Sequence, residues 1–324
     1  MAHNKLKLLS AFAGVKLLDR RVPLHVSWVV TSRCNLRCAY CNRPDTDPGE
    51  LTTGQATALI DDLARSGCAH VSITGGEPLL RKDLPILMAR IAASGMKINM
   101  NTNGLLLPER LNAVRLADSI VISLDGPLEL NDAIRGKGAW DGAMRGAEQV
   151  QSIGSPLTFY TVIGKSNVGE LRYLVELADR MRARVFFQPG ARQALGSECG
   201  ENLDAADPED YRRAIDELIE WKKRGRPIGN SVAALRYLRH WPDEMPMPSM
   251  GGRLYVRIDS DGHVRTSGRV PRGEMNSALG PGGIVAAMQK IPAPQSDSTY
   301  SAARVEVNLM AQGSPGAMWN FLKK

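Results

Sequence analysis

Short apolar runs rich in β-branched residues alternate with amphipathic stretches from Val22 onward. The runs predict strands, and the stretches between them carry apolar residues at the three- to four-residue spacing of helices. The predicted strands are 25–30, 70–74, 97–101, 119–124, 157–163 and 184–188, and the predicted helices are 53–66, 84–94, 108–115, 141–153, 168–181 and 208–223. This alternation is typical of parallel strands joined by helical crossovers, and it predicts an α/β fold of six β/α units.

The two ends of the chain depart from this alternation. Apolar residues recur at helical spacing from Leu6 to Leu18 among lysines and arginines, which predicts a short amphipathic helix within residues 1–22. That helix either docks on the main domain or makes a weak contact with a membrane surface. Residues 23–228 hold the six units, and residues 229–324 predict a small α+β domain.

A hairpin is the clearest feature of the C-terminal domain. Runs 254–258 and 263–266 flank the sequence Asp259-Ser260-Asp261-Gly262. We interpret this as a tight turn and not as a calcium loop, because the later acidic ligands of such a loop are missing.

The charge is moderately basic: 41 Lys and Arg against 34 Asp and Glu give a net charge of +7. This excess favours anionic partners such as phosphates and carboxylates. The basic residues are spread along the chain without interleaved aromatics, so no nucleic-acid partner is expected. No apolar run is long enough for a transmembrane segment, and five cysteines with three clustered do not resemble a disulfide framework. We therefore expect a cytoplasmic protein.

The three clustered cysteines carry the strongest chemical signal. Cys34, Cys38 and Cys41 follow the first predicted strand with Cys-x3-Cys-x2-Cys spacing. Three thiolates on one loop can hold three irons of a cubane cluster and leave the fourth iron open. A zinc site with a fourth ligand from elsewhere is the alternative.

Three further motifs follow predicted strands. They are Gly75-Gly76-Glu77-Pro78 after the second strand, Asn101-Thr102-Asn103-Gly104 after the third and Ser123-Leu124-Asp125-Gly126-Pro127 after the fourth. The carboxyl ends of parallel strands lie on one face of a sheet or barrel, so these motifs are expected to converge there.

Together with the cysteine loop, these motifs resemble the radical S-adenosylmethionine (SAM) superfamily over roughly residues 23–190. The resemblance implies a partial (β/α)6 TIM-like barrel and one [4Fe-4S] cluster that cleaves SAM reductively. The 5'-deoxyadenosyl radical so formed would abstract a hydrogen atom from a substrate. An electron donor such as flavodoxin or ferredoxin is a further implied partner.

The resemblance also implies a role for each motif residue. Cys34, Cys38 and Cys41 would hold the cluster, and the loop of Gly75, Gly76, Glu77 and Pro78 would receive the SAM ammonium. The glycines would leave room for the ligand, and Pro78 would aim Glu77. The other implied SAM contacts are Tyr40 against adenine, Ser123 on the ribose or tail, Arg135 on the carboxylate, and Asn103 facing the site.

Some of these residues have plainer alternatives. Ser123 and Asn103 can cap loops, and Arg135 can be a surface residue. For Glu77 we find no structural role in the sequence. Cys68 is expected to be a small buried apolar residue, whereas Cys199 either donates a hydrogen atom to a substrate radical, as in some epimerases of the superfamily, or is an inert loop thiol.

From about Met247 the chain resembles the SPASM/twitch extension, which normally binds auxiliary iron–sulfur clusters. Where that pattern expects cysteines, this chain has Ser249, Ser267, Ser296, Thr299 and Ser301. Hydroxyls ionise at far higher pH than thiols and cannot replace soft thiolate ligands. We therefore predict a degenerate extension without an auxiliary cluster, arising either by divergence or by substitution.

Without an auxiliary cluster to accept an electron, a redox-neutral reaction is favoured: epimerisation, rearrangement or elimination. The predicted substrate is a polar small molecule, with sugar-like compounds included. The alternatives are a peptide- or protein-modifying enzyme that uses the C-terminal unit for docking, and a scaffold that binds cluster and SAM without turnover.

Overall fold

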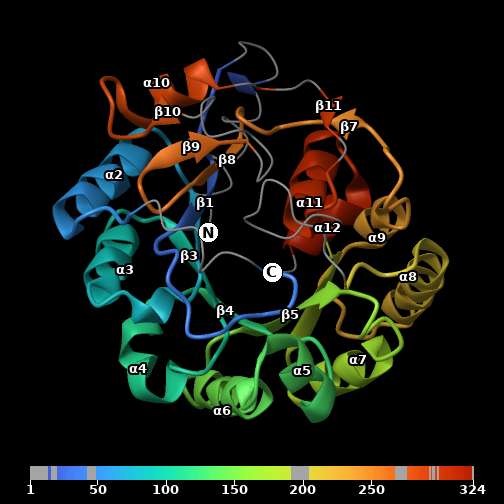
Figure 1. Cartoon of the computed structure of the whole chain (residues 1–324). Coiled ribbons are helices and arrows are strands. Elements are labelled where there is room, and N and C mark those ends of the chain that lie inside the picture. The colour runs from blue at the N-terminus through green and yellow to red at the C-terminus, as the bar shows by residue number, and fades with distance from the viewer. Residues whose placement is uncertain are drawn as a thin grey trace.

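Six parallel strands form the centre of the computed structural model, in the order in which they occur along the chain. The structure describes residues 14–15, 20–41, 49–190, 204–266, 276–291, 293, 296–297 and 299–322. The strands are β1 His25–Val29, β2 His70–Thr74, β3 Lys97–Thr102, β4 Ser119–Ser123, β5 Leu157–Ile163 and β6 Arg184–Pro189. All six predicted strands are confirmed, and Figure 1 shows them curving as in a partial TIM-like barrel.

The helices form an outer ring around these strands (Figure 1). They are α2 Thr53–Arg65, α3 Leu84–Ala93, α4 Leu107–Val114, α5 Leu128–Arg135, α6 Ala139–Ser152, α7 Leu171–Arg180 and α8 Pro208–Lys223, with a 3-10 turn, η2, at Pro78–Leu80. The six predicted helices are confirmed to within three residues at each end. Helix α5 was not predicted, because its eight mostly polar residues directly after Pro127 resemble a loop.

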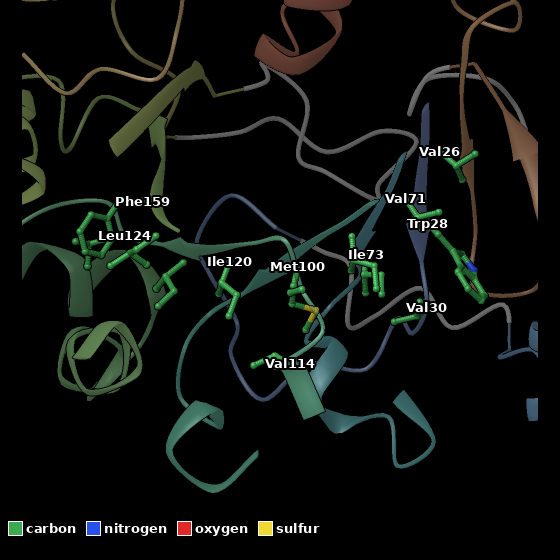
Figure 2. Packing of buried hydrophobic residues seen from close by; sticks show 14 of the residues in the cluster. Val26, Trp28, Val30, Val71, Ile73, Met100, Val114, Ile120, Leu124 and Phe159 are labelled. Carbon is green, nitrogen blue, oxygen red and sulfur yellow. The ribbon is translucent and has the colours of Figure 1, made fainter. Parts of the chain in front are cut away.

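Alternate strand residues build the core between sheet and helices. Val26, Trp28, Val71 and Ile73 are fully buried on this side, and Figure 2 shows them in one layer with residues of the later strands. Successive side chains of a strand point to opposite faces, so the intervening residues line the inside of the barrel. Many of these are polar, as in Ser72, whose Oγ accepts a bond of 3.0 Å from Asn101.

The C-terminal residues extend the same sheet. Strand β8 Tyr255–Ile258 pairs in parallel with β1, and β9 His263–Arg265 and β10 Asn276–Ser277 follow in antiparallel order. This confirms the predicted hairpin, although the domain boundary at residue 229 stays a prediction. Around this edge and the end of β6 lie α9 Val232–Leu238, α10 Gly283–Lys290, α11 Ala302–Ala311 and α12 Pro315–Leu322, with the short pair β7 Met247–Pro248 and β11 Ser296–Asp297.

The turn of the hairpin is held by charge and not by a metal-binding geometry. Asp259 forms ion pairs of 3.0 Å with Arg257 and 2.6 Å with Arg265. The two arginines use the carboxylate that a calcium loop would turn toward its ion, so the tight-turn interpretation holds.

Two predictions fall outside the described residues. The N-terminal helix does so except for residues 14 and 15, which are helical, and Cys199 does so entirely. Within the described ranges, no helix is both long and apolar enough to cross a membrane.

Candidate metal and cofactor site

The cysteine loop lies at the carboxyl end of β1 and is tied to α5. Cys34, Cys38 and Cys41 are all half-buried, and the Cys41 amide donates to the Cys38 carbonyl at 2.9 Å. The amide of Ala39, next to Cys38, donates to the Ile134 carbonyl at 2.8 Å. The loop therefore presents its thiols from a backbone that is fixed at both ends.

The three thiols suit a cluster better than a single metal ion. Burial raises the pKa of Cys34, and it raises that of Cys38 to about 11, with the charges of neighbouring thiolates adding to the effect. Soft, closely spaced thiolates on one loop are the donor set that an iron–sulfur cluster uses to offset this cost. No three His, Cys, Asp or Glu side chains in the described ranges converge as a mononuclear site requires, whereas thiolates on separate irons of a cubane need not converge.

The loop after β2 pairs with the cysteine loop backbone to backbone. The Gly76 amide donates to the Thr31 carbonyl at 2.9 Å, and the Glu77 amide donates to the Arg33 carbonyl at 2.8 Å. A Cβ on Gly75 would lie 2.5 Å from the Thr31 oxygen, and one on Gly76 would lie 2.2 Å from the Arg33 oxygen. The expected reason for the glycines is thus wrong: their free space is taken by the neighbouring backbone and not by a ligand.

The carbonyl oxygens of this loop are a separate matter. Those of Gly75 and Gly76 accept no hydrogen bond in the part of the chain that the structure describes. They are acceptors of the kind that an ammonium group requires. The role of the loop toward SAM stays a prediction.

Glu77 has a structural role, contrary to our expectation. Its carboxylate is fully buried and accepts bonds from the Leu79 amide at 3.0 Å, the Thr102 hydroxyl at 2.9 Å and the Asn103 amide at 2.8 Å. It thereby caps η2, where Pro78 is the first residue, and joins the ends of β2 and β3. Burial raises the pKa of Glu77 to about 7, against the opposing effect of the three donors.

Asn103 connects the end of β3 to the cysteine loop. Its side-chain amide donates to Asn35 Oδ1 at 2.7 Å, and its Oδ1 accepts from the Leu105 amide at 3.0 Å. The loop-capping alternative is therefore correct for Asn103. Ser123, at the end of β4, is half-buried and makes no side-chain hydrogen bond among the described residues, so its hydroxyl is available to a ligand.

Arg135, Tyr40 and Asp125 form a buried cluster under the cysteine loop. The Arg135 side chain is only 7% exposed, so the surface alternative is wrong. Its Nε lies 2.7 Å from Asp125 Oδ2, and the Tyr40 hydroxyl donates to the same oxygen at 2.9 Å. The sequence analysis missed Asp125, although its place directly after a strand, in the same motif as Ser123, is a signal that could have identified it.

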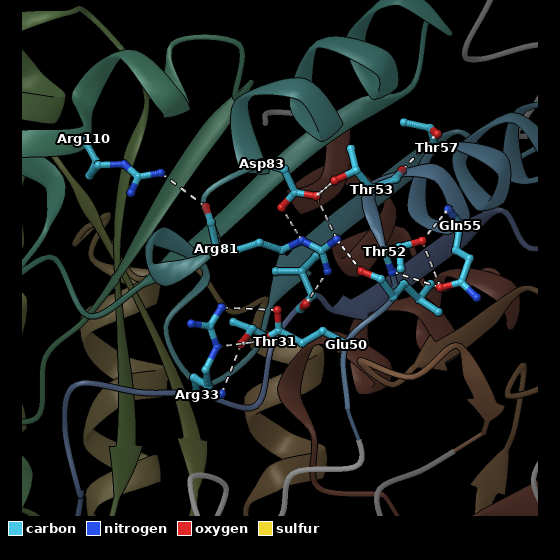
Figure 3. Close-up of polar contacts among 12 residues, drawn as sticks. Thr31, Arg33, Glu50, Thr52, Thr53, Gln55, Thr57, Arg81, Asp83 and Arg110 are labelled. Atoms are coloured by element: carbon cyan, nitrogen blue, oxygen red, sulfur yellow. Dashed lines mark hydrogen bonds and ion pairs between the residues drawn. The ribbon is translucent and has the colours of Figure 1, made fainter.

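A second polar cluster, centred on Arg81, supports the start of the cysteine loop and was also missed (Figure 3). The buried Arg81 guanidinium donates to the carbonyls of Val30 at 2.9 Å and Leu51 at 2.7 Å and pairs with Asp83 at 2.7 Å. Figure 3 also shows Glu50 held by Thr31 and by Arg33, whose Nε lies 2.7 Å away. Arg81 follows the Gly75–Pro78 motif by three residues, which alone gives no hint of this role.

The remaining candidate residues have structural surroundings. Cys68 is fully buried, as expected. Ser249 is buried and accepts from the Gly251 amide at 3.1 Å, whereas Thr299 is buried and accepts from the Ser301 amide at 3.4 Å. Ser296 is exposed, and Ser267 lies outside the described residues. The prediction that there is no auxiliary cluster continues to rest on the sequence.

Comparison with known proteins gives consistent matches. A family profile described as "Radical SAM superfamily" matches residues 28–178. The AdoMet-dependent heme synthase of Oleidesulfovibrio alaskensis is 34% identical over 273 residues, which cover 75% of this chain and 69% of that protein. The Fe-coproporphyrin III synthase of Methanosarcina barkeri is 37% identical over 225 residues, covering 66% and 55%, and the mycofactocin maturase MftC of Mycobacterium ulcerans is 37% identical over 189 residues, covering 56% and 51%. The chain thus spans about half the length of the last two relatives.

Solved structures show the same fold. SuiB of Streptococcus suis bound to S-adenosylmethionine superimposes with a TM-score of 0.70 at 17% identity, covering 90% of this chain and 70% of that one. The structure titled anSMEcpe with bound AdoMet gives a TM-score of 0.65 at 18% identity, with 83% and 79% covered. These matches confirm the α/β TIM-like architecture.

Proposed function

Because the chain belongs to the radical SAM superfamily, whose cofactors are a [4Fe-4S] cluster and SAM, we propose that it abstracts a hydrogen atom from a small carboxylated molecule. Cys34, Cys38 and Cys41 would hold the cluster. When bound, cluster and SAM together supply a hydrogen-abstracting radical. A small electron-transfer protein such as a flavodoxin or ferredoxin would provide the electron.

The residues around the cysteine loop suit the polar ends of SAM. The carbonyls of Gly75 and Gly76 accept no other bond in the described ranges and can take an ammonium group. Ser123 offers a hydroxyl without a partner there, at the next but one strand end. These groups would orient SAM, while the apolar packing of Tyr40 with Ile134 and Val162 excludes water from the site.

The polar inner face of the barrel is the observation that carries the substrate class. Tyr160 on β5 donates from its hydroxyl to Gln188 on β6 at 2.7 Å. Arg257 on β8 is in register with Ser27 on β1, on the face opposite the fully buried Ile258. Polar groups fix the orientation of a small ligand, and a guanidinium suits a carboxylate.

The relatives point the same way. Two of them are named for tetrapyrroles, as Fe-coproporphyrin III synthase and AdoMet-dependent heme synthase, and coproporphyrin is a carboxylated small molecule. We therefore propose carboxylated tetrapyrroles as the first substrate class to test. A redox-neutral outcome remains our proposal for the reaction type, since no cysteine follows Cys199.

The test is anaerobic reconstitution followed by dithionite, SAM and a panel of candidate substrates. We expect carboxylated tetrapyrroles to stimulate 5'-deoxyadenosine formation, and neutral sugars and unrelated peptides to have no effect. No 5'-deoxyadenosine under any condition from protein with full iron content would refute turnover and support the scaffold alternative. Equal stimulation by neutral and carboxylated compounds would refute the proposed substrate class.

A peptide substrate is the second candidate, favoured by the relative MftC, a maturase. It predicts transfer of deuterium from a labelled peptide into 5'-deoxyadenosine. Transfer from a peptide with none from the tetrapyrrole panel would assign this function instead.

A further inference from the structure

A buried carboxylate joins the end of β4 to the cysteine loop. Asp125 is fully buried; Oδ2 accepts from the Tyr40 hydroxyl at 2.9 Å, and Oδ1 accepts from the Val162 amide at 2.9 Å. The Asp125 amide in turn donates to Asn131 Oδ1 at 2.9 Å. Backbone and carboxylate are thus both fixed, and the remaining neighbour of the carboxylate is the cation of Arg135.

Arg135 reaches from this carboxylate to a cluster ligand. Its Nε lies 2.7 Å from Asp125, and its Nη1 lies 3.9 Å from Cys38 Sγ, within the range of a hydrogen bond to sulfur. The guanidinium carbon lies 5.7 Å from the centre of the Tyr40 ring, on the same loop as Cys38. The Nε–H is not aligned for a hydrogen bond, so charge and not fork geometry joins Arg135 to Asp125.

A cation in this place acts on the electron affinity of the cluster. Reduction makes the cluster one charge more negative, and a buried cation stabilises the more negative state more strongly. Hydrogen bonds to the ligand sulfurs raise the potential of iron–sulfur clusters in the same direction.

We propose that Arg135 donates to the thiolate of Cys38 and raises the reduction potential of the cluster, and that Asp125 is the positioning residue that holds Arg135 there. This role needs neither substrate nor SAM. It is therefore separate from any contact of Arg135 with the SAM carboxylate and from the proposed substrate class.

The test is a potentiometric titration of the reconstituted protein without SAM, followed by electron paramagnetic resonance. We expect R135Q to shift the cluster potential to more negative values and R135K, which keeps the charge, to shift it less. R90Q is the matched control, because Arg90 forms an exposed ion pair of 2.6 Å with Asp61 on the outer helices, and it should leave the potential unchanged. If R135Q fails to take up iron, R135K decides the question, and a native potential in every variant measured overturns the proposal.

The role of Asp125 is tested by comparing D125N in two backgrounds. If Asp125 acts through Arg135, D125N lowers the potential of the native protein by releasing the cation. In R135Q there is no cation to release, so D125N should raise the potential or leave it unchanged. The same shift in both backgrounds would show that the two residues act independently and overturn the positioning role.

Discussion

Glu77→Gln tests whether a buried carboxylate in the candidate site is costly to ionise. Glu77 is fully buried and accepts three hydrogen bonds, and burial raises its pKa from 4.5 to about 7. Glutamine keeps the shape of the side chain and removes its titration. The comparison of the two proteins across pH therefore isolates this one group from all others that titrate.

The sign follows from the raised pKa. The folded state holds the proton of Glu77 more tightly than the unfolded state, so this stabilisation is complete below pH 4.5 and is lost as the pH rises to about 7. Each pH unit between the two pKa values corresponds to about 1.4 kcal/mol, which gives a loss of about 3 kcal/mol. With about 2.1 cal/mol/K of unfolding entropy per residue over 324 residues, this equals about 4 °C in Tm.

The assay is thermal unfolding of the metal-free protein under reducing conditions from pH 4.5 to 8. We expect Glu77→Gln to gain about 4 °C relative to the native protein over this range. Glu148→Gln, on the exposed face of α6, is the matched control and should show no such trend. A native protein that instead gains on Glu77→Gln with rising pH would refute the reasoning, because the three donors would then outweigh burial.

Two further substitutions test the supports of the cysteine loop. Gly76→Ala places a Cβ 2.2 Å from the Arg33 oxygen and should cost about 1–3 kcal/mol of unfolding free energy and lower iron uptake, whereas Gly54→Ala, with nothing within 4 Å, should retain both; equal iron content and Tm in the two variants would contradict this. Arg81→Lys removes the guanidinium that satisfies two buried carbonyls and should cost about 2 kcal/mol or more in denaturant unfolding. Its control is Arg110→Lys, which loses one bond of 3.2 Å; a loss no larger for Arg81→Lys would count against that role.

Several residues that resemble ligand contacts also hold the loops of the site together. Glu77 and Asn103 bind neighbouring loops, and Gly76 allows one loop to lie against another. A loss of activity in variants of these residues therefore has two possible causes. Iron content and Tm measured beside activity separate structural from ligand-binding effects.

The hydrophobic pattern of the chain sufficed for the six strands and six of the helices, because buried strands and amphipathic helices have distinct periods. It failed for α5, whose eight residues offer too few apolar positions to show a helical period. The pattern also did not reveal that β8 pairs with β1, since pairing between distant segments leaves no local signal.

The sequence by itself determined the candidate chemistry: the spacing of Cys34, Cys38 and Cys41 and the motifs at the strand ends mark the cluster and cofactor site. Only the tertiary structure decided how that site is held. Asp125 reaches Arg135 and Tyr40, and Arg81 reaches the carbonyl of Val30, across gaps of ten to eighty-five residues. The physical reason is that a buried charge needs partners in space, and those partners have no fixed spacing along the chain.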